Sequence, residues 1–478
     1  MTNLDQFKQF YLMGIKGVAM TSLAQILLDL EKKVSGCDVA EDFVTQKILS
    51  KLNLKIDHGF THQLPDEIDC VVYTAAHGGI KNPIVVQALE KNLPVVSQAE
   101  ALAYFFNQKK GIAVCGVGGK TTVSAMIAWI LEKNNQPASF SIGVGEILGL
   151  SNTGRWNQNS EYFVAEADEY VINPEEKMDQ PKLTPRFSFL NPTINVCTNL
   201  EYDHPDVYHS LGHTKDIFTQ FFLQTKTGGS LIINQDNSHL VEIVKKINSD
   251  LDKEQIALKT FGKSVQADAS LLNSKITEQK NYGKAKINGQ SYAIELSLPG
   301  DFNLLNALTA TLAALELGIS IKDSLKALTT FQGTQRRFEF IGVKKGVFYY
   351  DDYAHHPHEI AQTIQALKEW FPTKKTTIAF QPHTYSRTKE MLPEFTSALS
   401  KAKEVLLLDI FPSAREQYDP NISSDLLVTE TRKLNPKTKI VNLKTIESLV
   451  DYCLHQLKED DVLLTMGAGD IYKLHDMI

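Results

Sequence analysis

The feature that most constrains the fold is a glycine-rich turn between an apolar strand and a helix. Residues 111–116 (GIAVCG) have the unbroken apolar character of a buried strand, and the loop VGGKTT follows at 117–122. From Val123 to Leu131 apolar residues recur with a period of about 3.6 residues, which predicts a helix. A strand, a glycine loop and a helix in this order predict a parallel α/β domain.

The residues of this loop suit the binding of nucleotide phosphates. Glycine backbones can turn their N–H groups onto phosphate oxygens, and the helix dipole favours an anion there. Lys120 would reach the β- and γ-phosphates, and the Thr121 hydroxyl would bind Mg²⁺. An ordinary tight turn is the alternative, because Val114 replaces the first glycine of the G-x-x-x-x-G-K-[ST] pattern. The predicted ATP-binding residues of the loop are Gly116, Gly118, Gly119, Lys120, Thr121 and Thr122.

The α/β pattern continues on both sides of the loop. The chain has 478 residues, which at about 150 per domain suggests three domains. Residues 260–297 alternate like an antiparallel ribbon, a helix is predicted at 303–317, and a polar segment at 331–337 marks a boundary. We predict an α/β protein of three domains: a Rossmann-like domain at 1–106, a P-loop ATPase-like domain at 107–332 and a second Rossmann-like domain at 333–478.

Charge and hydropathy exclude several classes of function. The net charge of −7 gives no general attraction to nucleic acid or anionic lipid. No apolar run approaches the roughly 20 residues of a membrane-spanning helix, and the start of the chain has no basic segment typical of a signal peptide. We therefore expect a cytoplasmic monomer or homodimer with no nucleic-acid or membrane partner. Five widely spaced cysteines predict neither a disulfide framework nor a zinc site; they are Cys37, Cys70, Cys115, Cys197 and Cys453.

Two further segments place polar residues at strand ends. Gly14, Ile15, Lys16 and Gly17 follow the first predicted strand, and Asp38 ends the next, a spacing similar to that of a dinucleotide site or of a plain Rossmann-like turn.

After the strand EYFVA, alternation predicts that Glu166 and Asp168 point the same way, at the sheet edge where α/β proteins bind ligands. Carboxylate oxygens suit Mg²⁺.

Two more candidate pairs lie after residue 300. Asn303 and Asn306 lie one helical turn apart, so both amides can face one ligand edge, unless they only cap the helix. His383 and Arg387 follow an apolar strand, and a guanidinium there suits the carboxylate of an amino acid.

In order and spacing, these segments resemble the Mur ligase family. Beside the phosphate loop, the resemblance rests on GIKGVAM at 14–20, VAEADEY at 164–170, TNLEYDHPDVY at 198–208, RRFE at 336–339, DDYAHHP at 351–357 and FQPHTYSRT at 380–388. It spans almost the whole chain. The resemblance implies a ligase of peptidoglycan precursor synthesis that uses ATP and Mg²⁺ to join an amino acid to a UDP-sugar carboxylate through an acyl-phosphate.

The resemblance also implies roles for single residues. The Gly14–Gly17 loop, with Lys16 as cationic partner and Asp38 nearby, would hold the UDP-sugar diphosphate. Glu166 and His204 would bind Mg²⁺ together with Thr121. The remaining roles are adenine binding by Asn303 and Asn306, phosphate and ribose binding by Arg337 and Asp352, and amino-acid binding by Tyr353, His355, His356, His383 and Arg387.

The identity of the amino acid rests on two segments that favour different branches. FQPHTYSRT is similar to the branch that adds L-alanine to UDP-N-acetylmuramate. The segment at 170–195 is longer than the corresponding segment of that branch. Within it, KLTPRFSFL at 182–190 is similar to the related ligase that reattaches a recycled tripeptide. We predict L-alanine and UDP-N-acetylmuramate as substrates. Tripeptide ligation is one alternative, and a non-catalytic UDP-sugar or nucleotide sensor is another.

Overall fold

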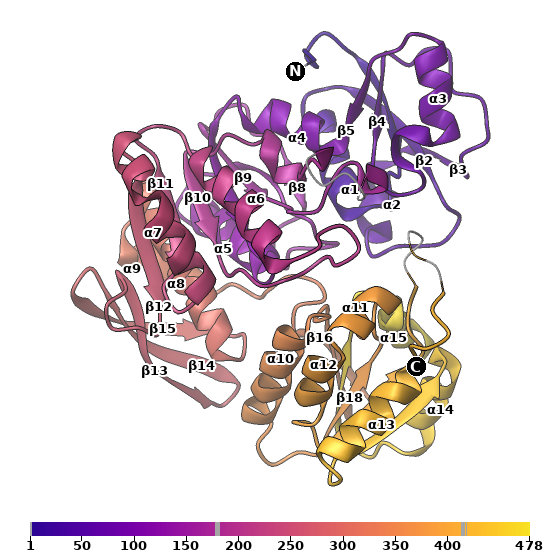
Figure 1. Cartoon of the computed structure of the whole chain (residues 1–478), viewed down its shortest axis with the longest axis vertical. Helices are drawn as coiled ribbons and strands as arrows, with labels where there is room; N and C mark the ends of the chain where they lie inside the picture. Colours follow the sequence, from indigo (N-terminus) through magenta and orange to yellow (C-terminus); the bar gives the residue numbers. More distant parts are fainter. Residues whose placement is uncertain (1, 177–181, 413–415, 417) are drawn as a thin grey trace.

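Three sheets follow one another along the chain (Figure 1). The computed structural model describes residues 2–176, 182–412, 416 and 418–478. The predicted segment 170–195 thus lies partly outside the described residues, at 177–181. Each sheet has apolar strands covered by helices, as a parallel α/β arrangement requires.

The first sheet has five parallel strands in the order β3-β2-β1-β4-β5, which is the Rossmann order. Its central strand β1 buries Phe10 to Met13 completely, and the Gly14–Gly17 loop connects it to α1. The elements are β1 (Gln9–Met13), α1 (Val18–Asp29), β2 (Lys33–Asp38), α2 (Gln46–Leu52), β3 (Lys55–His58), β4 (Cys70–Tyr73), α3 (Pro83–Glu90), β5 (Val95–Ser97) and α4 (Gln98–Phe106).

The second sheet has ten strands in the order β15-β14-β13-β12-β11-β10-β6-β9-β7-β8. The strand β6 and the helix α5 enclose the phosphate loop, as predicted. The elements are β6 (Lys110–Cys115), α5 (Lys120–Lys133), β7 (Ser139–Ser141), β8 (Gly154–Arg155), β9 (Tyr162–Glu166), β10 (Ile194–Cys197), α6 (Leu211–Leu223), β11 (Ser230–Asn234), α7 (Ser238–Lys253), β12 (Ala257–Gly262), the antiparallel ribbon β13 (Ala269–Thr277), β14 (Lys280–Ile287) and β15 (Gln290–Leu296), α8 (Asp301–Glu316) and α9 (Ile321–Leu328).

The third sheet has six strands in the order β16-β17-β21-β18-β19-β20, and only β16 runs antiparallel to its neighbour. The elements are β16 (Glu339–Lys344), β17 (Val347–Asp352), α10 (Pro357–Trp370), β18 (Thr376–Phe380), α11 (Tyr385–Glu390), α12 (Leu392–Leu399), β19 (Glu404–Leu408), α13 (Ser424–Leu434), β20 (Lys439–Lys444), α14 (Ile446–His455), β21 (Val462–Met466) and α15 (Leu474–Met477).

The predicted α/β class and the three-domain organisation are confirmed. The limits 1–106, 107–332 and 333–478 stay predictions, although each sheet lies within one of these segments. No helix among the described residues is long and apolar enough to cross a membrane. All five cysteines are buried and free of disulfides.

The apolar cores join the three parts unequally. One core cluster runs from the first sheet into the second, where Phe105 and Phe106 of α4 contact Trp156 and Phe163 edge to face. Among the described residues, the core of the third part touches the second through partly buried side chains, those of Tyr202, Ile276 and Phe302. The first two parts are therefore packed together more extensively than either is with the third.

Candidate active site

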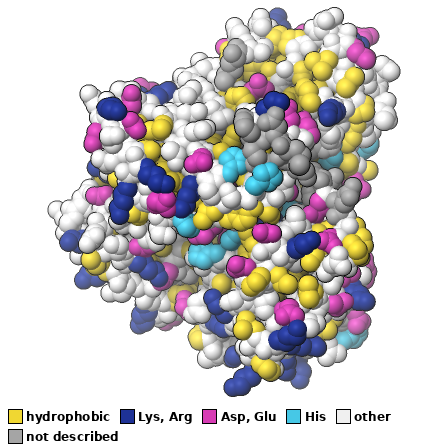
Figure 2. Space-filling model, viewed as in Figure 1, with side chains coloured by type: hydrophobic (Ala, Val, Ile, Leu, Met, Phe, Trp, Pro, Cys, Tyr) yellow, Lys and Arg dark blue, Asp and Glu magenta, His cyan; other side chains and the backbone are white. Residues whose placement is uncertain are grey.

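Two cavities lie between the parts of the molecule. The larger, of 970 Å³, is lined by residues of all three parts. The smaller, of 310 Å³, lies between the second and third parts and contains residues of the phosphate loop, α8 and α10. Figure 2 shows histidine side chains gathered near the middle of the visible face, between these parts. The chemistry-bearing motifs of the sequence therefore converge at one place in the molecule.

The phosphate loop has the backbone shape that its glycines permit. Gly116 and Gly119 have φ values of 121° and 83°, in the region that favours glycine. The Lys120 ammonium donates to the Gly116 carbonyl at 2.6 Å and contacts both oxygens of Glu169 at 2.9 and 3.1 Å. Burial lowers the pKa of Lys120, but Glu169, with the carboxylates near it, more than offsets this and raises that pKa overall. Lys120 is thus a fully charged cation beside the loop.

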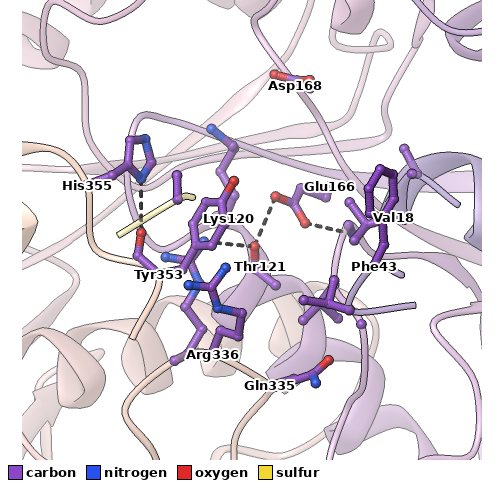
Figure 3. A pocket seen from close by; sticks show the side chains of 18 of the residues that line it. Val18, Phe43, Lys120, Thr121, Glu166, Asp168, Gln335, Arg336, Tyr353 and His355 are labelled. Carbon is purple, nitrogen blue, oxygen red and sulfur yellow. Dashed lines mark hydrogen bonds between the residues drawn. The ribbon is translucent and has the colours of Figure 1, made fainter. Parts of the chain in front are cut away.

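Thr121 and Glu166 form a pair that fits a hard divalent cation. The Thr121 hydroxyl donates to Glu166 Oε1 at 3.0 Å, and the other Glu166 oxygen accepts from the Gly143 N–H at 2.9 Å (Figure 3). Burial raises the pKa of Glu166, so its carboxylate is short of compensating charge. An all-oxygen donor set with an undercompensated carboxylate suits Mg²⁺. Thr121 and Glu166 are therefore the residues that would hold the ion.

His204 belongs to a second group, with Glu169 and Asp203. Ligand atoms of these three residues lie within 4.8 Å of one another, and His204 Nε2 is 3.3 Å from Glu169 Oε1. Burial lowers the pKa of His204, but Asp203 and Glu169 raise it overall. The two carboxylates already contact Lys120 and Arg387, which makes this group a poorer Mg²⁺ site than Thr121 and Glu166. The role of His204 as a metal ligand stays a prediction.

The smaller cavity contains most of the residues predicted to bind ATP. Asn306 donates to Asn303 at 3.3 Å, and Asn303 itself donates to the Pro299 carbonyl at 2.8 Å. Asp352 accepts from two backbone N–H groups, and burial raises its pKa to about 6. The predicted residues that line this cavity are Gly118, Gly119, Thr122, Asn303, Asn306, Arg337 and Asp352. Gly119, Lys120, Thr121 and Arg337 line the larger one.

The first glycine loop opens toward the larger cavity, but its cation is engaged elsewhere. The Lys16 ammonium donates to the carbonyls of Val39, Ala40 and Glu41 at 2.8–3.2 Å. Asp38 is buried and accepts from the N–H groups of Lys16 and Val39. Lys16 and Gly17 line the cavity, whereas Gly14, Ile15 and Asp38 are not among its lining residues. In this structure Lys16 and Asp38 hold the loop at 39–41 rather than presenting charge to a phosphate.

The residues predicted to bind the amino acid differ in whether they line the larger cavity. Tyr353 and His355 line the larger cavity. Burial lowers the pKa of His355 to about 3, so its ring is neutral near pH 7.

Three other residues predicted to bind the amino acid are not among those that line the larger cavity: His356, His383 and Arg387. Arg387 is 5% exposed and contacts Asp203 through Nε at 3.1 Å and Nη2 at 2.7 Å. His383 lies 3.3 Å from Arg387 Nη1, and His356 accepts from the His358 N–H at the start of α10. The predicted carboxylate clamp is thus closed on a carboxylate of the protein itself.

Sequence reasoning missed three charged residues of the site. Asp203 was part of a recognised motif, but its partner Arg387 lies 184 positions away. Glu359 of α10 lines both cavities, 3.9 Å from Arg337. Arg186 lines the larger cavity from within the long segment after β9. A signal for Glu359 was its place in the first turn of α10, two residues after the DDYAHHP motif, from which it reaches His355 at 3.7 Å.

A phosphate loop beside a hydroxyl–carboxylate pair, in a cavity lined by three α/β parts, fits the class of ATP-dependent ligases. The chain belongs to the Mur ligase family. Three family models match it in succession: "Mur ligase family, catalytic domain" at residues 9–110, "Mur ligase middle domain" at 114–314 and "Mur ligase, glutamate ligase domain" at 336–469.

Individual relatives agree with this assignment. The UDP-N-acetylmuramate–L-alanine ligase of Clostridium tetani is 34% identical, over 99% of this chain and 98% of that protein. Two solved structures share the fold. One is the UDP-N-acetylmuramate-alanine ligase of Thermotoga maritima, 24% identical with a TM-score of 0.78 over 98% of this chain and 97% of that one. The other is a murein peptide ligase of Psychrobacter arcticus, 22% identical with a TM-score of 0.68 over 98% of each chain.

Proposed function

We propose that this chain joins L-alanine to the carboxylate of UDP-N-acetylmuramate, at the expense of ATP, in peptidoglycan precursor synthesis. The observation that carries the proposal is the single cavity in which the first glycine loop, the phosphate loop and the third part of the chain meet. A ligase of this kind has to bring a UDP-sugar, ATP and an amino acid together. The amino acid itself is taken from the name of the full-length relative in Clostridium tetani.

The first half of the reaction is a phosphoryl transfer. A carboxylate oxygen of the sugar forms a bond to the γ-phosphorus, the bond to the bridging oxygen of ADP breaks, and an acyl-phosphate results. Lys120, Arg337 and the N–H groups of the loop would stabilise the charge that develops on the transferred group. Mg²⁺, when held by Thr121 and Glu166, would add positive charge at the same phosphates.

The second half is an acyl transfer. The neutral amine of alanine attacks the acyl carbon, the bond to phosphate breaks, and one amine proton leaves. Tyr353 and His355 would border the amino acid, because they line the cavity on the side of the third part. The acyl-phosphate has to be kept from water, and a site lined by three parts can exclude water when these parts close on the substrates.

A ligation assay tests the proposal. The full chain is incubated with ATP, Mg²⁺ and UDP-N-acetylmuramate, together with L-alanine, glycine, L-serine or the stem tripeptide. We expect ADP release that depends on both substrates, and the highest kcat/KM with L-alanine. A higher kcat/KM with the tripeptide would assign the chain to the recycling branch, and binding without turnover would indicate a sensor.

A further inference from the structure

Arg186 is fixed at the end of β9 by the long segment that follows this strand. Val171 and Pro185 of this segment pair in an antiparallel bridge. The Arg186 N–H then donates to the Tyr170 carbonyl at 2.8 Å. The excursion therefore brings an arginine, 16 residues later in the chain, back beside the point at which it began.

The guanidinium of Arg186 is held from two sides. Nη1 donates to Asp168 Oδ2 at 2.7 Å, and the guanidinium carbon lies 5.6 Å from the centroid of the Tyr170 ring. The Arg186 side chain is 21% exposed. Among the described residues, Asp168 is the one side-chain hydrogen-bond partner that Arg186 has. Its Nε and Nη2 groups therefore remain able to donate to a ligand that enters the cavity.

Arg186 lines the larger cavity together with residues of both glycine loops. It begins the short helix η4 (Arg186–Phe189), which packs against α4 of the first part. Gln98 and Leu102 of α4 line the same cavity as Arg186. On the other side, Asp168 lines the same cavity as Lys120, and in Figure 3 it lies apart from the Thr121–Glu166 pair. A UDP-sugar that extends from the first loop toward Lys120 would lie in the cavity that this arginine lines.

Among the other cations that line the larger cavity, Arg336 is engaged by Asp351 and by the carbonyls of Gly467 and Gly469, and Lys473 lines the cavity from the third part. Lys16 is engaged by three backbone carbonyls, and Lys120 by Glu169 and a carbonyl. Arg337 lies 3.3 Å from the Thr121 hydroxyl, on the phosphate side. A sugar carboxylate that approaches the γ-phosphate is repelled by it, so an additional cation at the carboxylate is needed to bring the two anions together.

We propose that Arg186 binds the reacting carboxylate of UDP-N-acetylmuramate and aims it at the γ-phosphate. This inference rests on the proposed function and names a residue that acts in it. Asp168 and Tyr170 orient the guanidinium, and the two free N–H groups donate to the carboxylate oxygens. The long segment after β9 then has a role, because it supplies this arginine.

Calorimetric binding to the full chain tests the inference. The probes are UDP-N-acetylmuramate and UDP-N-acetylglucosamine, which is the same nucleotide sugar without the lactyl ether and its carboxylate. Arg186→Gln is expected to weaken binding of the first at least about tenfold, as for a lost charge-assisted hydrogen bond, and that of the second less than twofold. In turnover, KM for UDP-N-acetylmuramate should rise while KM for ATP and for L-alanine stays within twofold.

Arg155→Gln is a matched control. Arg155 is 23% exposed, pairs with Glu132 at 2.8 Å and lies over the ring of Phe140, but it lines neither cavity. This variant should bind both probes as the wild type does. Arg186→Lys, which keeps the charge but loses the planar fork, should weaken binding of UDP-N-acetylmuramate to an intermediate extent.

Two results would overturn the role of Arg186. Unchanged binding of UDP-N-acetylmuramate by Arg186→Gln would show that the arginine does not touch it. An equal loss with both nucleotide sugars would show that Arg186 acts on the diphosphate or on the fold. The wild-type protein keeps these outcomes separate from the proposed function. If the wild type fails to ligate L-alanine, the proposed function is wrong. If the wild type ligates L-alanine and either result above is found, only the role proposed for Arg186 is refuted.

Discussion

Cations at the centre of the site are each paired with a carboxylate of the protein. Lys120 pairs with Glu169, Arg387 with Asp203, and Arg337 lies near Glu359. A buried charge without a partner is costly, so these pairs keep the cations in place when no substrate anion is bound. A substrate anion that binds Lys120 or Arg337 would then compete with a carboxylate that is already there.

Loss of the loop lysine should stop the reaction without affecting the sugar site. We expect Lys120→Ala to lower kcat by about 10²- to 10³-fold, as for the removal of one donor to developing charge. Binding of UDP-N-acetylmuramate should stay within about twofold. Lys133→Ala, at the exposed far end of the same helix, serves as the control. Near-normal turnover of Lys120→Ala would refute the assignment of the phosphate loop.

Asp352 should make stability depend on pH between about 4 and 6. Burial raises the pKa of Asp352 from 3.8 to about 6, so ionisation of this residue disfavours the folded state. Its contribution to stability is therefore greatest below pH 4 and falls as the pH rises to 6, by up to about 3 kcal/mol. Thermal unfolding of the wild type and of Asp352→Asn at pH 4 and pH 7 measures this. Relative to the wild type, the variant should be more stable at pH 7 than at pH 4. The same stability difference between variant and wild type at both pH values would contradict the expectation.

The local part of the site could be predicted from the sequence, but its long-range pairs could not. Lys120 and Thr121 follow from a loop whose strand and helix are adjacent in sequence. The expected role of Lys16 at the diphosphate stays a prediction, and nothing in the sequence indicated that its ammonium donates to the carbonyls of residues 39–41. Likewise, no periodicity in the sequence indicates that Arg387 meets Asp203. Such contacts depend on how separate parts pack together.

At the scale of elements, the loop between β6 and α5 is determined by its glycines. Gly119 has φ of 83°, and a Cβ there would lie 2.9 Å from Asn306 Oδ1. Gly118 has no such backbone requirement, and its Cβ would meet the flexible end of Glu359. The two positions therefore differ in backbone strain while both face a side-chain oxygen at close range.

This difference predicts unequal effects of alanine. Gly119→Ala should lower the free energy of unfolding by about 1–2 kcal/mol and weaken ATP binding, because the left-handed backbone and the contact with Asn306 are both strained. Gly118→Ala should lower the free energy of unfolding by a smaller amount, because the end of the Glu359 side chain can move. Chemical denaturation and ATP titration of both variants provide the comparison. A stability loss as large in Gly118→Ala as in Gly119→Ala would argue against backbone strain as the cause.

Elements with clear patterns were predicted, and elements without them were not. The alternation in 260–297 predicted the ribbon β13–β15, because one face of each strand is buried. The strand β3 (Lys55–His58) was not predicted, since it is short, lies at the sheet edge and buries none of its residues fully. Glu166 and Asp168 were expected to share a direction, but β9 ends at Glu166, and the two carboxylates bind different partners.

For the whole molecule, the packing indicates which part moves. The first and second parts share a core, whereas the third contacts the second through a few partly buried side chains and the buried Arg387–Asp203 pair. Substrate entry requires an opening, and we expect the third part to separate, because it shares no core cluster of buried residues with the other two among the described residues.

Removal of the cross-part pair should therefore open the ligand-free protein. Arg387→Ala leaves a buried aspartate without its cation, which costs roughly 2–5 kcal/mol in the closed arrangement. Small-angle scattering should show a radius of gyration larger on the order of 1 Å, against about 23 Å for a compact chain of this length. Lys389→Ala, on the same helix and paired with Asp419 within the third part, is the control. An unchanged radius in Arg387→Ala would show that the pair does not hold the parts together.

The central claim is that ATP activates the sugar carboxylate in the shared cavity for attack by L-alanine. Labelling that carboxylate of UDP-N-acetylmuramate with ¹⁸O tests it most directly, since an acyl-phosphate transfers one carboxylate oxygen to the released phosphate. Mass spectrometry of the inorganic phosphate should find one ¹⁸O for each amide bond formed with L-alanine. Unlabelled phosphate with normal product formation would contradict the acyl-phosphate, and no alanine-dependent product at all would contradict the ligase.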